Sequence, residues 1–161
     1  MKNLFLLTIF ICTLTMTSSF GQTQLVEGRA RVIDGDTIKI GKSRIRLHGI
    51  DAPESKQRCK DKKLNYWLCG QAATKALRKK INNRVVECFS DKKDKYKRHI
   101  AICSVDGMSL NQWLVLNGWA IAYRYYSTDY ILEEKYARDN KLGIWKSEFL
   151  KPYQYRKNNK K

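Results

Sequence analysis

The sequence has few of the groups on which several familiar sites depend. Only two histidines, His48 and His99, occur in 161 residues, so a ribonuclease mechanism with paired histidines could use no other pair. No two cysteines are spaced as C-x-x-C, the arrangement typical of zinc sites. The one long apolar run, residues 4–16, is shorter than the roughly 20 residues that a membrane span needs. These shortages disfavour zinc-binding and membrane-spanning proteins and leave the two-histidine mechanism as a minor alternative.

The apolar run has the surroundings of a secretory signal peptide. Lys2 precedes it, and Ser19 and Gly21 supply the small residues that cleavage sites prefer. We predict cleavage after Gly21 and export, to the periplasm or outside the cell, with a retained membrane anchor as the alternative. The mature chain is long enough for one domain, which we place at residues 22–147 and follow with a basic, aromatic tail at residues 148–161.

Negative charge is also scarce. The chain has 15 Asp and Glu residues against 32 Lys and Arg, a net charge of +17. Loss of residues 1–21 would remove only Lys2 among the charged residues and leave +16. Such an excess predicts a polyanionic partner, and nucleic acid, anionic lipid and acidic polysaccharide all qualify. Tyr123, Tyr125 and Tyr126 favour nucleic acid, because bases stack on such rings.

Four cysteines remain after the predicted cleavage, which is an even number for a small exported domain. That pattern predicts two disulfides, with a zinc site as the alternative. We pair Cys59 with Cys69, within a loop before the first helix, and Cys88 with Cys103, across two neighbouring strands.

The order of local signals predicts an α+β protein built on a five-stranded OB-type barrel. Alternating apolar residues at 28–49 predict three strands, and residues 84–89 and 96–105 predict two more. Polar residues at 50–68 indicate a loop. Helical spacing predicts helices at 70–81 and 129–141, and a third helix begins at Ser109, whose Gln112 partner suggests a capping box. The resulting order, β-β-β-α-β-β-α-α, matches an OB barrel, whereas residues 156–161 have little to bury and are expected to be disordered.

The few acidic residues are concentrated near the predicted strand ends. Asp34, Asp36, Asp51 and Glu54 fall within 21 positions. Adjacent antiparallel strands would bring Asp36 and Asp51 together. With backbone carbonyls from the Pro53 loop they would form a hard-oxygen site suited to calcium or magnesium. The alternative is that the aspartates serve only as turn and cap residues.

Several longer motifs point to one family. Val32-Ile33-Asp34-Gly35-Asp36-Thr37 and Arg46-Leu47-His48-Gly49-Ile50-Asp51-Ala52-Pro53-Glu54 are followed by Asp94-Lys95-Tyr96-Lys97-Arg98, Asn117-Gly118-Trp119-Ala120 with Tyr123, and Leu142-Gly143-Ile144-Trp145. In this order they resemble the signatures of the thermonuclease (staphylococcal or micrococcal nuclease) family. The resemblance covers nearly the whole mature chain.

The resemblance implies a calcium-dependent endonuclease that cleaves DNA and RNA at the bond to the 5′ oxygen and leaves 3′-phosphate ends. It implies three groups of site residues, which are the metal ligands Asp36, Asp51 and the Ala52 carbonyl, the catalytic residues Arg46, Glu54 and Arg98, and the substrate-binding residues Lys95, Tyr96, Tyr123 and Tyr125. Glu54 would activate water, and the two arginines would bind the phosphate, for which guanidinium is well suited.

Two residues depart from the family's usual pattern. Ala52 stands where threonine is common, but a backbone carbonyl ligand survives that change. Lys97 stands where glycine is common, beside Arg98. We expect a monomer with no lasting membrane attachment after cleavage, and a tail that aids binding without affecting the chemical step. A non-catalytic nucleic-acid-binding OB module and a cationic surface protein are the rival interpretations.

Overall fold

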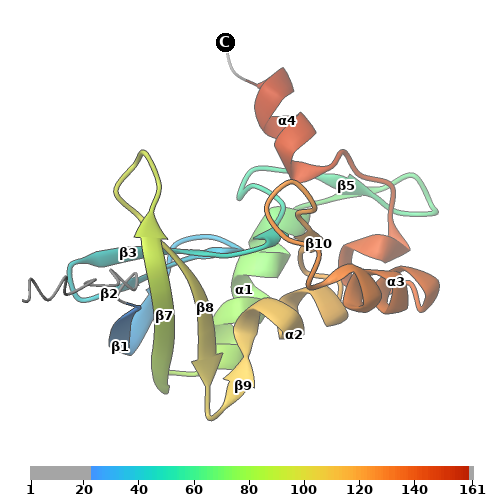
Figure 1. The fold of residues 1–161 in the computed structure, drawn as a ribbon. Helices are drawn as coiled ribbons and strands as arrows, with labels where there is room; N and C mark the ends of the chain where they lie inside the picture. Colours follow the sequence, from blue (N-terminus) through green and yellow to red (C-terminus); the bar gives the residue numbers. More distant parts are fainter. Residues whose placement is uncertain (1–22, 160–161) are drawn as a thin grey trace, which may run out of the picture.

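The computed structural model describes residues 23–159. The predicted signal peptide, residues 1–21, lies outside the described residues. Five strands form a closed barrel: β1 (Gln24–Val32), β2 (Thr37–Ile40), β3 (Ser43–Leu47), β7 (Val85–Lys93) and β8 (His99–Val105). They follow the order β3-β2-β1-β7-β8 with antiparallel neighbours, and a parallel pairing of β3 with β8 closes the barrel (Figure 1). The predicted five-stranded α+β barrel is confirmed.

The barrel forms because alternate side chains of its strands turn inward. Ile38, Ile45 and Val86 are completely buried in the main core, together with Leu77 from α1 (Cys69–Ile81). In α1, buried Ala73, Leu77 and Ile81 recur every four residues, which places them on one face of the helix. The helix predicted at 70–81 is therefore confirmed and packs on the barrel.

The β7–β8 hairpin is longer than its sequence indicates. We expected the charged residues 90–95 to form a connection, but Lys92 pairs with Ile100 and Lys93 with His99 after a register shift that follows Ser90. Exposed lysines are tolerated here because this part of the hairpin extends away from the core. The true turn is therefore confined to the residues between Lys93 and His99.

The remaining helices surround one end of the barrel. They are α2 (Leu110–Leu116), α3 (Ile131–Asp139), the 3₁₀ turn η1 (Gly143–Lys146) and α4 (Pro152–Asn158). The Ser109 side chain caps α2 by accepting from the backbone N–H of Gln112. The Gln112 side chain instead donates to Glu133, so the predicted capping box is only half formed. Within residues 23–159, no helix has both the length and the apolar content needed to cross a bilayer.

The stretch predicted as a loop, residues 50–68, holds three short strands. β4 (Ile50–Asp51) pairs with β10 (Ile121–Ala122), and β5 (Cys59–Lys60) pairs with β6 (Tyr66–Trp67). A sixth strand of the main sheet, β9 (Met108–Ser109), pairs with β8. Such two-residue strands are too short to show a periodic pattern, and the pairing of β4 with β10 also joins segments that are far apart in the sequence.

Both predicted disulfides are present. Cys59 is bonded to Cys69 beside the start of α1, and Cys88 is bonded to Cys103 across the β7–β8 pair. All four cysteines are completely buried. The first bond ties the segment after β4 to α1, and the second joins two barrel strands.

The expectation of disorder after residue 155 is wrong for the described part of the tail. α4 begins with buried Pro152 and continues to Asn158. Just before it, the carbonyl of Leu150 accepts a hydrogen bond from the buried Gln57 side chain at 2.7 Å. Proline is favoured in the first turn of a helix, and this tertiary anchor provides the stability that the polar tail sequence lacks.

Candidate active site

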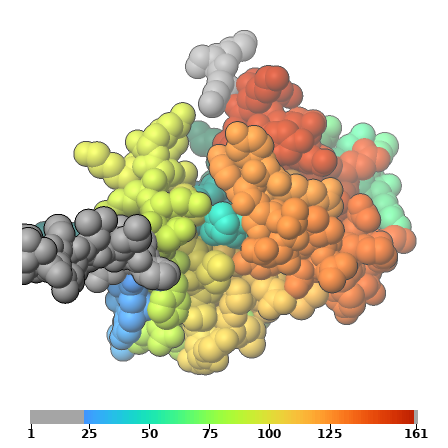
Figure 2. Space-filling view, in the orientation of Figure 1, coloured from blue at the N-terminus to red at the C-terminus, as the bar shows by residue number. Residues whose placement is uncertain are grey.

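A cleft of about 560 Å³ opens on one side of the barrel. Figure 2 shows the chain near residue 50, in teal, in a recess between the β7–β8 hairpin, in yellow-green, and the segment near residue 125, in orange. Five of the predicted site residues line the cleft: Arg46, Glu54, Tyr96, Arg98 and Tyr123. Lys92, Lys93, Tyr126 and Arg156 also line it but were not among the predicted site residues.

Two buried aspartates meet beside this cleft. Asp36 directly precedes β2, and Asp51 lies in β4; they are 2% and 0% exposed. One Asp36 oxygen accepts from the backbone N–H of Ala52 at 2.9 Å, which links the ends of the two segments. The sequence interpretation correctly brought Asp36 and Asp51 together.

Arg46 joins the two aspartates. Its Nη1 lies 2.7 Å from Oδ1 of Asp36, and its Nη2 donates to Oδ1 of Asp51 at 2.8 Å. The β2–β3 register pairs Arg46 with Thr37, so the hairpin itself carries the guanidinium to Asp36. The position of Arg46 therefore follows from strand pairing.

The buried carboxylates concentrate negative charge in the site. Burial raises the pKa of Asp51 against the opposing effect of the arginines, and burial together with neighbouring Asp36 raises the pKa of Asp34 to about 6. Although burial opposes it, Asp36 and Asp51 raise the pKa of Arg46. Such carboxylates favour the approach of additional positive charge.

Arg156 of α4 supplies some of that charge. Its Nη1 donates to Asp51 Oδ1 and to Glu54 Oε1, both at 2.8 Å, and its Nη2 donates to Asp51 Oδ2 at 3.1 Å. No motif identified this residue, because nothing local distinguishes one arginine in a basic tail from its neighbours. Its contacts cross 105 residues of sequence.

Arg98 is held at the turn of the β7–β8 hairpin. Asp94 accepts from Arg98 Nε at 2.8 Å, and its other oxygen accepts from the backbone N–H groups of Tyr96 and Arg98. These bonds lower the pKa of Asp94 although partial burial opposes them. Lys97 adopts φ of 61°, a left-handed conformation that glycine enters more easily and that this lysine takes in the hairpin turn.

Tyrosines form a second wall of the cleft. Tyr123 lies parallel to Tyr153 of α4, with ring centroids 6.0 Å apart, and edge-on to Tyr126 at 4.9 Å. Tyr96 is largely exposed, and Lys95 and Arg98 lie over its ring. Tyr125 is 82% exposed. Neither Tyr125 nor Lys95 lines the cleft.

The oxygen donors of the cleft suit a hard cation. Among residues 23–159, no three His, Cys, Asp or Glu side chains gather as a metal cage. Asp36 and Asp51 nevertheless provide buried oxygens, and the guanidinium of Arg156 already lies against Asp51 and Glu54. A site that accommodates a positive group among hard oxygens fits calcium or magnesium in its chemistry.

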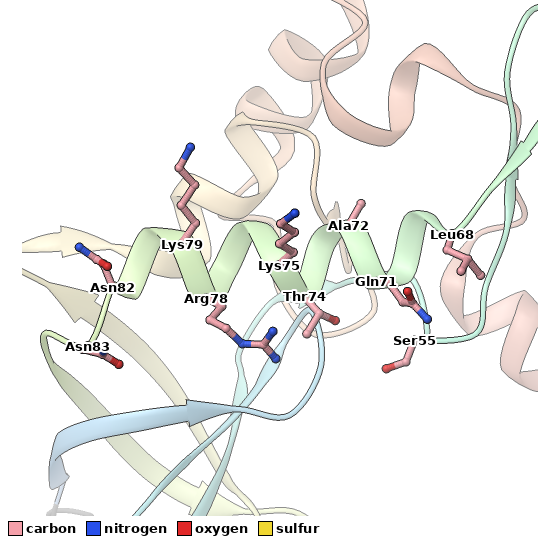
Figure 3. A pocket seen from close by; sticks show the side chains of 10 residues that line it. All are labelled: Ser55, Leu68, Gln71, Ala72, Thr74, Lys75, Arg78, Lys79, Asn82 and Asn83. Carbon is pink, nitrogen blue, oxygen red and sulfur yellow. The ribbon is translucent and has the colours of Figure 1, made fainter.

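A larger cavity, of about 860 Å³, runs along α1. It is lined by Lys75, Arg78 and Lys79 but by no carboxylate. In Figure 3 the Lys79 and Arg78 side chains extend from opposite edges of the helix, so they do not converge on one point. This surface adds to the positive field of the protein, and the groups capable of chemistry lie in the smaller cleft.

The comparisons with known proteins agree with this geometry. A family model described as "Staphylococcal nuclease homologue" matches residues 44–147. The succinoglycan biosynthesis protein ExoI of Rhizobium meliloti (strain 1021) is 33% identical over 144 residues, covering 86% of this chain and 74% of that protein. An uncharacterized endonuclease of Escherichia coli O157:H7 is 36% identical over 128 residues, covering 74% and 77%. Endonuclease YncB of Bacillus subtilis (strain 168) is 35% identical over 130 residues, covering 71% and 59%. The chain therefore belongs to the family of staphylococcal nuclease homologues.

Proposed function

We propose that this protein is an exported, calcium-dependent endonuclease that hydrolyses phosphodiester bonds in DNA and RNA. The observation that carries the proposal is the cleft in which Arg46 bridges two buried aspartates beside Glu54 and Arg98. Family membership and the endonuclease names of two relatives support a nuclease. The charge of +17 supports a polyanionic substrate.

Asp36, Asp51 and the Ala52 carbonyl would hold the calcium ion, which would offset the charge that develops on the phosphate oxygens. Arg46 and Arg98 bind the same phosphate from two sides of the cleft. Glu54 takes a proton from the attacking water. The water oxygen bonds to phosphorus, the bond to the 5′ oxygen breaks, and a proton reaches that oxygen, which leaves a 3′-phosphate and a 5′-hydroxyl.

The aromatic wall would recognise the nucleotide. Tyr123 and Tyr96 line the cleft and would stack on a base or sugar beside the scissile phosphate, and stacking on aromatic rings tolerates any base. This supports activity on both DNA and RNA. Lys95 and Tyr125 stand outside the cleft, so their proposed contacts would be with more distant nucleotides.

The rival interpretations predict different results. A non-catalytic OB module would bind nucleic acid without cutting it, but here the carboxylates and arginines of the motifs converge on one cleft. A cationic surface protein is the second rival, and the name of one relative refers to succinoglycan biosynthesis rather than to a nuclease. Neither rival needs a water-activating carboxylate beside two arginines.

The test is incubation of plasmid DNA and of RNA with the purified protein, in calcium or in excess chelator. We expect cleavage in calcium, none in chelator, recovery on adding calcium back, and products that carry 3′-phosphate ends. Undiminished cleavage in chelator would contradict the calcium assignment and favour the two-histidine mechanism. Binding without cleavage in calcium would favour the non-catalytic module.

Export and a monomeric state are part of the same proposal. Two buried disulfides are typical of an oxidising compartment, which supports the signal peptide read from the sequence. N-terminal sequencing of the protein recovered outside the cytoplasm should begin at Gln22, and sedimentation should give the mass of one chain. A sequence that begins at Met1 would show that no cleavage occurs.

A further inference from the structure

The C-terminal helix is fastened beside the candidate active site. Buried Pro152 begins α4, the preceding Leu150 carbonyl is bonded to Gln57, and Tyr153 lies parallel to Tyr123. Figure 1 shows α4, in red, next to the orange loop that follows β10. The helix therefore carries its side chains to the cleft from a part of the chain that no motif of the family covers.

Arg156 occupies the oxygens that a cation would use. Both oxygens of Asp51 accept from its guanidinium, and so does one oxygen of Glu54. Arg46 takes Oδ1 of Asp51 as well, so no Asp51 oxygen is without an arginine partner. Glu54, the proposed base, is held by the same guanidinium.

A divalent cation and both arginines cannot all bind the Asp51 carboxylate at once. Asp36, Asp51 and Glu54 supply three negative charges when ionised, and Arg46 and Arg156 supply two positive charges. A divalent cation at Asp51 would need the same carboxylate oxygens to which both arginines already donate. Like charges at such distances repel strongly where water is limited, so one positive group has to withdraw.

Arg156 is the group able to withdraw. Arg46 belongs to β3 and is paired in the β2–β3 ladder, whereas Arg156 lies near the end of a helix of seven residues and is 30% exposed. Its side chain can turn into solvent, whereas the Arg46 side chain is only 16% exposed and contacts both buried aspartates. The carboxylate partners of Arg156 would exchange one cation for another.

We propose that Arg156 is a positioning residue that holds Asp51 and Glu54 in the cation-free site and competes directly with the divalent metal for them. This inference rests on the proposed function, because it takes the metal to bind at Asp36 and Asp51. Calcium binding then has two consequences. The metal replaces the Arg156 guanidinium at Asp51, and Glu54 is released from the same guanidinium to act as the base.

The test measures calcium binding without nucleic acid, by titration calorimetry on the purified protein. The variants are Arg156→Gln, Arg156→Lys and, as the matched control, Lys157→Gln. Lys157 is exposed on the same helix, so its loss removes the same charge without removing a contact. Hydrogen bonds to charged groups are strong enough that Arg156→Gln should tighten calcium binding about ten-fold, with a smaller gain for Arg156→Lys and less than about two-fold for Lys157→Gln.

Melting temperature gives a second readout. In chelator, Arg156→Gln should melt below the parent, because Glu54 then loses its ion pair with Arg156 and Asp51 keeps only its contact with Arg46. Added calcium should raise its melting temperature by more than it raises that of the parent. Arg156→Lys retains a positive charge on the helix and provides the same comparison if the glutamine variant folds poorly.

The outcomes separate the two proposals. Equal calcium affinity in the parent and Arg156→Gln, or an equal gain in Lys157→Gln, would overturn the competition while leaving the nuclease proposal intact. Calcium binding by none of the proteins would overturn the metal assignment and this inference together. Tighter binding confined to the Arg156 variants is the expected result.

Discussion

Two arginines contact Asp51, one from nearby in the sequence and one from the C-terminal helix, and they are held in different ways. Arg46 lies five residues away on β3, and its neighbours on that strand are paired with β2. Arg156 lies 105 residues away on α4, which is attached through Gln57, Pro152 and the Tyr123–Tyr153 pair. Arg98 is a third case, held within its own hairpin by Asp94.

The different attachment of the two arginines makes the Arg46 contact with Asp51 permanent and the Arg156 contact replaceable. Arg46 lies on a strand of the barrel wall and its side chain is 16% exposed, whereas Arg156 lies on one short helix and its side chain is 30% exposed. Elements with few buried contacts open at low free energy. We therefore assign the barrel side of the site to catalysis and the C-terminal side to control of access by the cation.

The largest expected effect tests the barrel side. Arg46→Lys keeps the charge but loses the planar, bidentate contact with the phosphate, and Glu54→Gln removes the base. If both groups act in the transition state, kcat and kcat/KM should fall together, on the order of 100-fold or more for each. Steady-state kinetics on a short DNA substrate in saturating calcium measures this.

The matched control is Arg44→Lys, because Arg44 is exposed on the same strand and paired with Lys39. It should change kcat by less than about two-fold. Near-parental rates for both Arg46→Lys and Glu54→Gln would refute the assignment of roles on the barrel side.

The next effect tests how α4 is attached. Gln57 is completely buried, accepts from the backbone N–H of Glu54 and donates to Leu150. Gln57→Ala leaves both backbone groups unpaired, which should lower the free energy of unfolding by about 1–3 kcal/mol. Urea denaturation measures the loss, and faster proteolysis near α4 should accompany it.

Gln71→Ala serves as the control, because Gln71 is exposed on α1, and it should change stability by less than about 0.5 kcal/mol. An equally small loss for Gln57→Ala would mean that α4 is held by other contacts and that the two sides of the site differ less than we infer.

A smaller effect concerns the local support of Arg98. Because hydrogen bonds from the hairpin lower the pKa of Asp94 in the folded protein, its contribution to stability is present above its unfolded pKa of about 4. That contribution is lost as pH falls through the lower folded value. Asp94→Asn should therefore be less stable than the parent at pH 7, by about 0.5–1 kcal/mol, with a difference that shrinks below about pH 4.

Urea denaturation at pH 7 and pH 3 tests whether the stability difference between Asp94→Asn and the parent shrinks in acid. Asp91→Asn is the control, since Asp91 is exposed on the same hairpin and should show little change at either pH. A difference for Asp94→Asn that grows in acid would contradict the local support of Arg98.

The smallest expected effect concerns the aromatic contact of α4. Tyr153→Ala removes the ring that lies parallel to Tyr123, which should raise KM a few-fold and leave kcat nearly unchanged, because stacking acts on bound substrate before and during reaction alike. Tyr155→Ala on the same helix is the control, because among residues 23–159 Tyr155 forms no aromatic pair with Tyr123. A fall in kcat instead would place α4 within the chemical machinery.

Much of the fold and half of the site could be predicted because the signals are local. Alternation specifies β2 and β3, a turn directly precedes Thr37, and their antiparallel pairing then carries Arg46 to Asp36. The Ser109 cap depends on four consecutive residues. The disulfide partners lie 10 and 15 residues apart, within loops and strands that the pattern had already located.

The sequence by itself determined the barrel, its main helices and the meeting of Asp36 and Asp51, because strand pairing at short separation leaves few alternatives. Only the tertiary structure decided that β7 continues to Lys93, that residues 50–51 pair with 121–122, and that Arg156 binds Asp51 and Glu54. These contacts join segments with no shared periodicity. Their free energy comes from burial and charge pairing that exist only once the barrel has brought distant parts of the chain together.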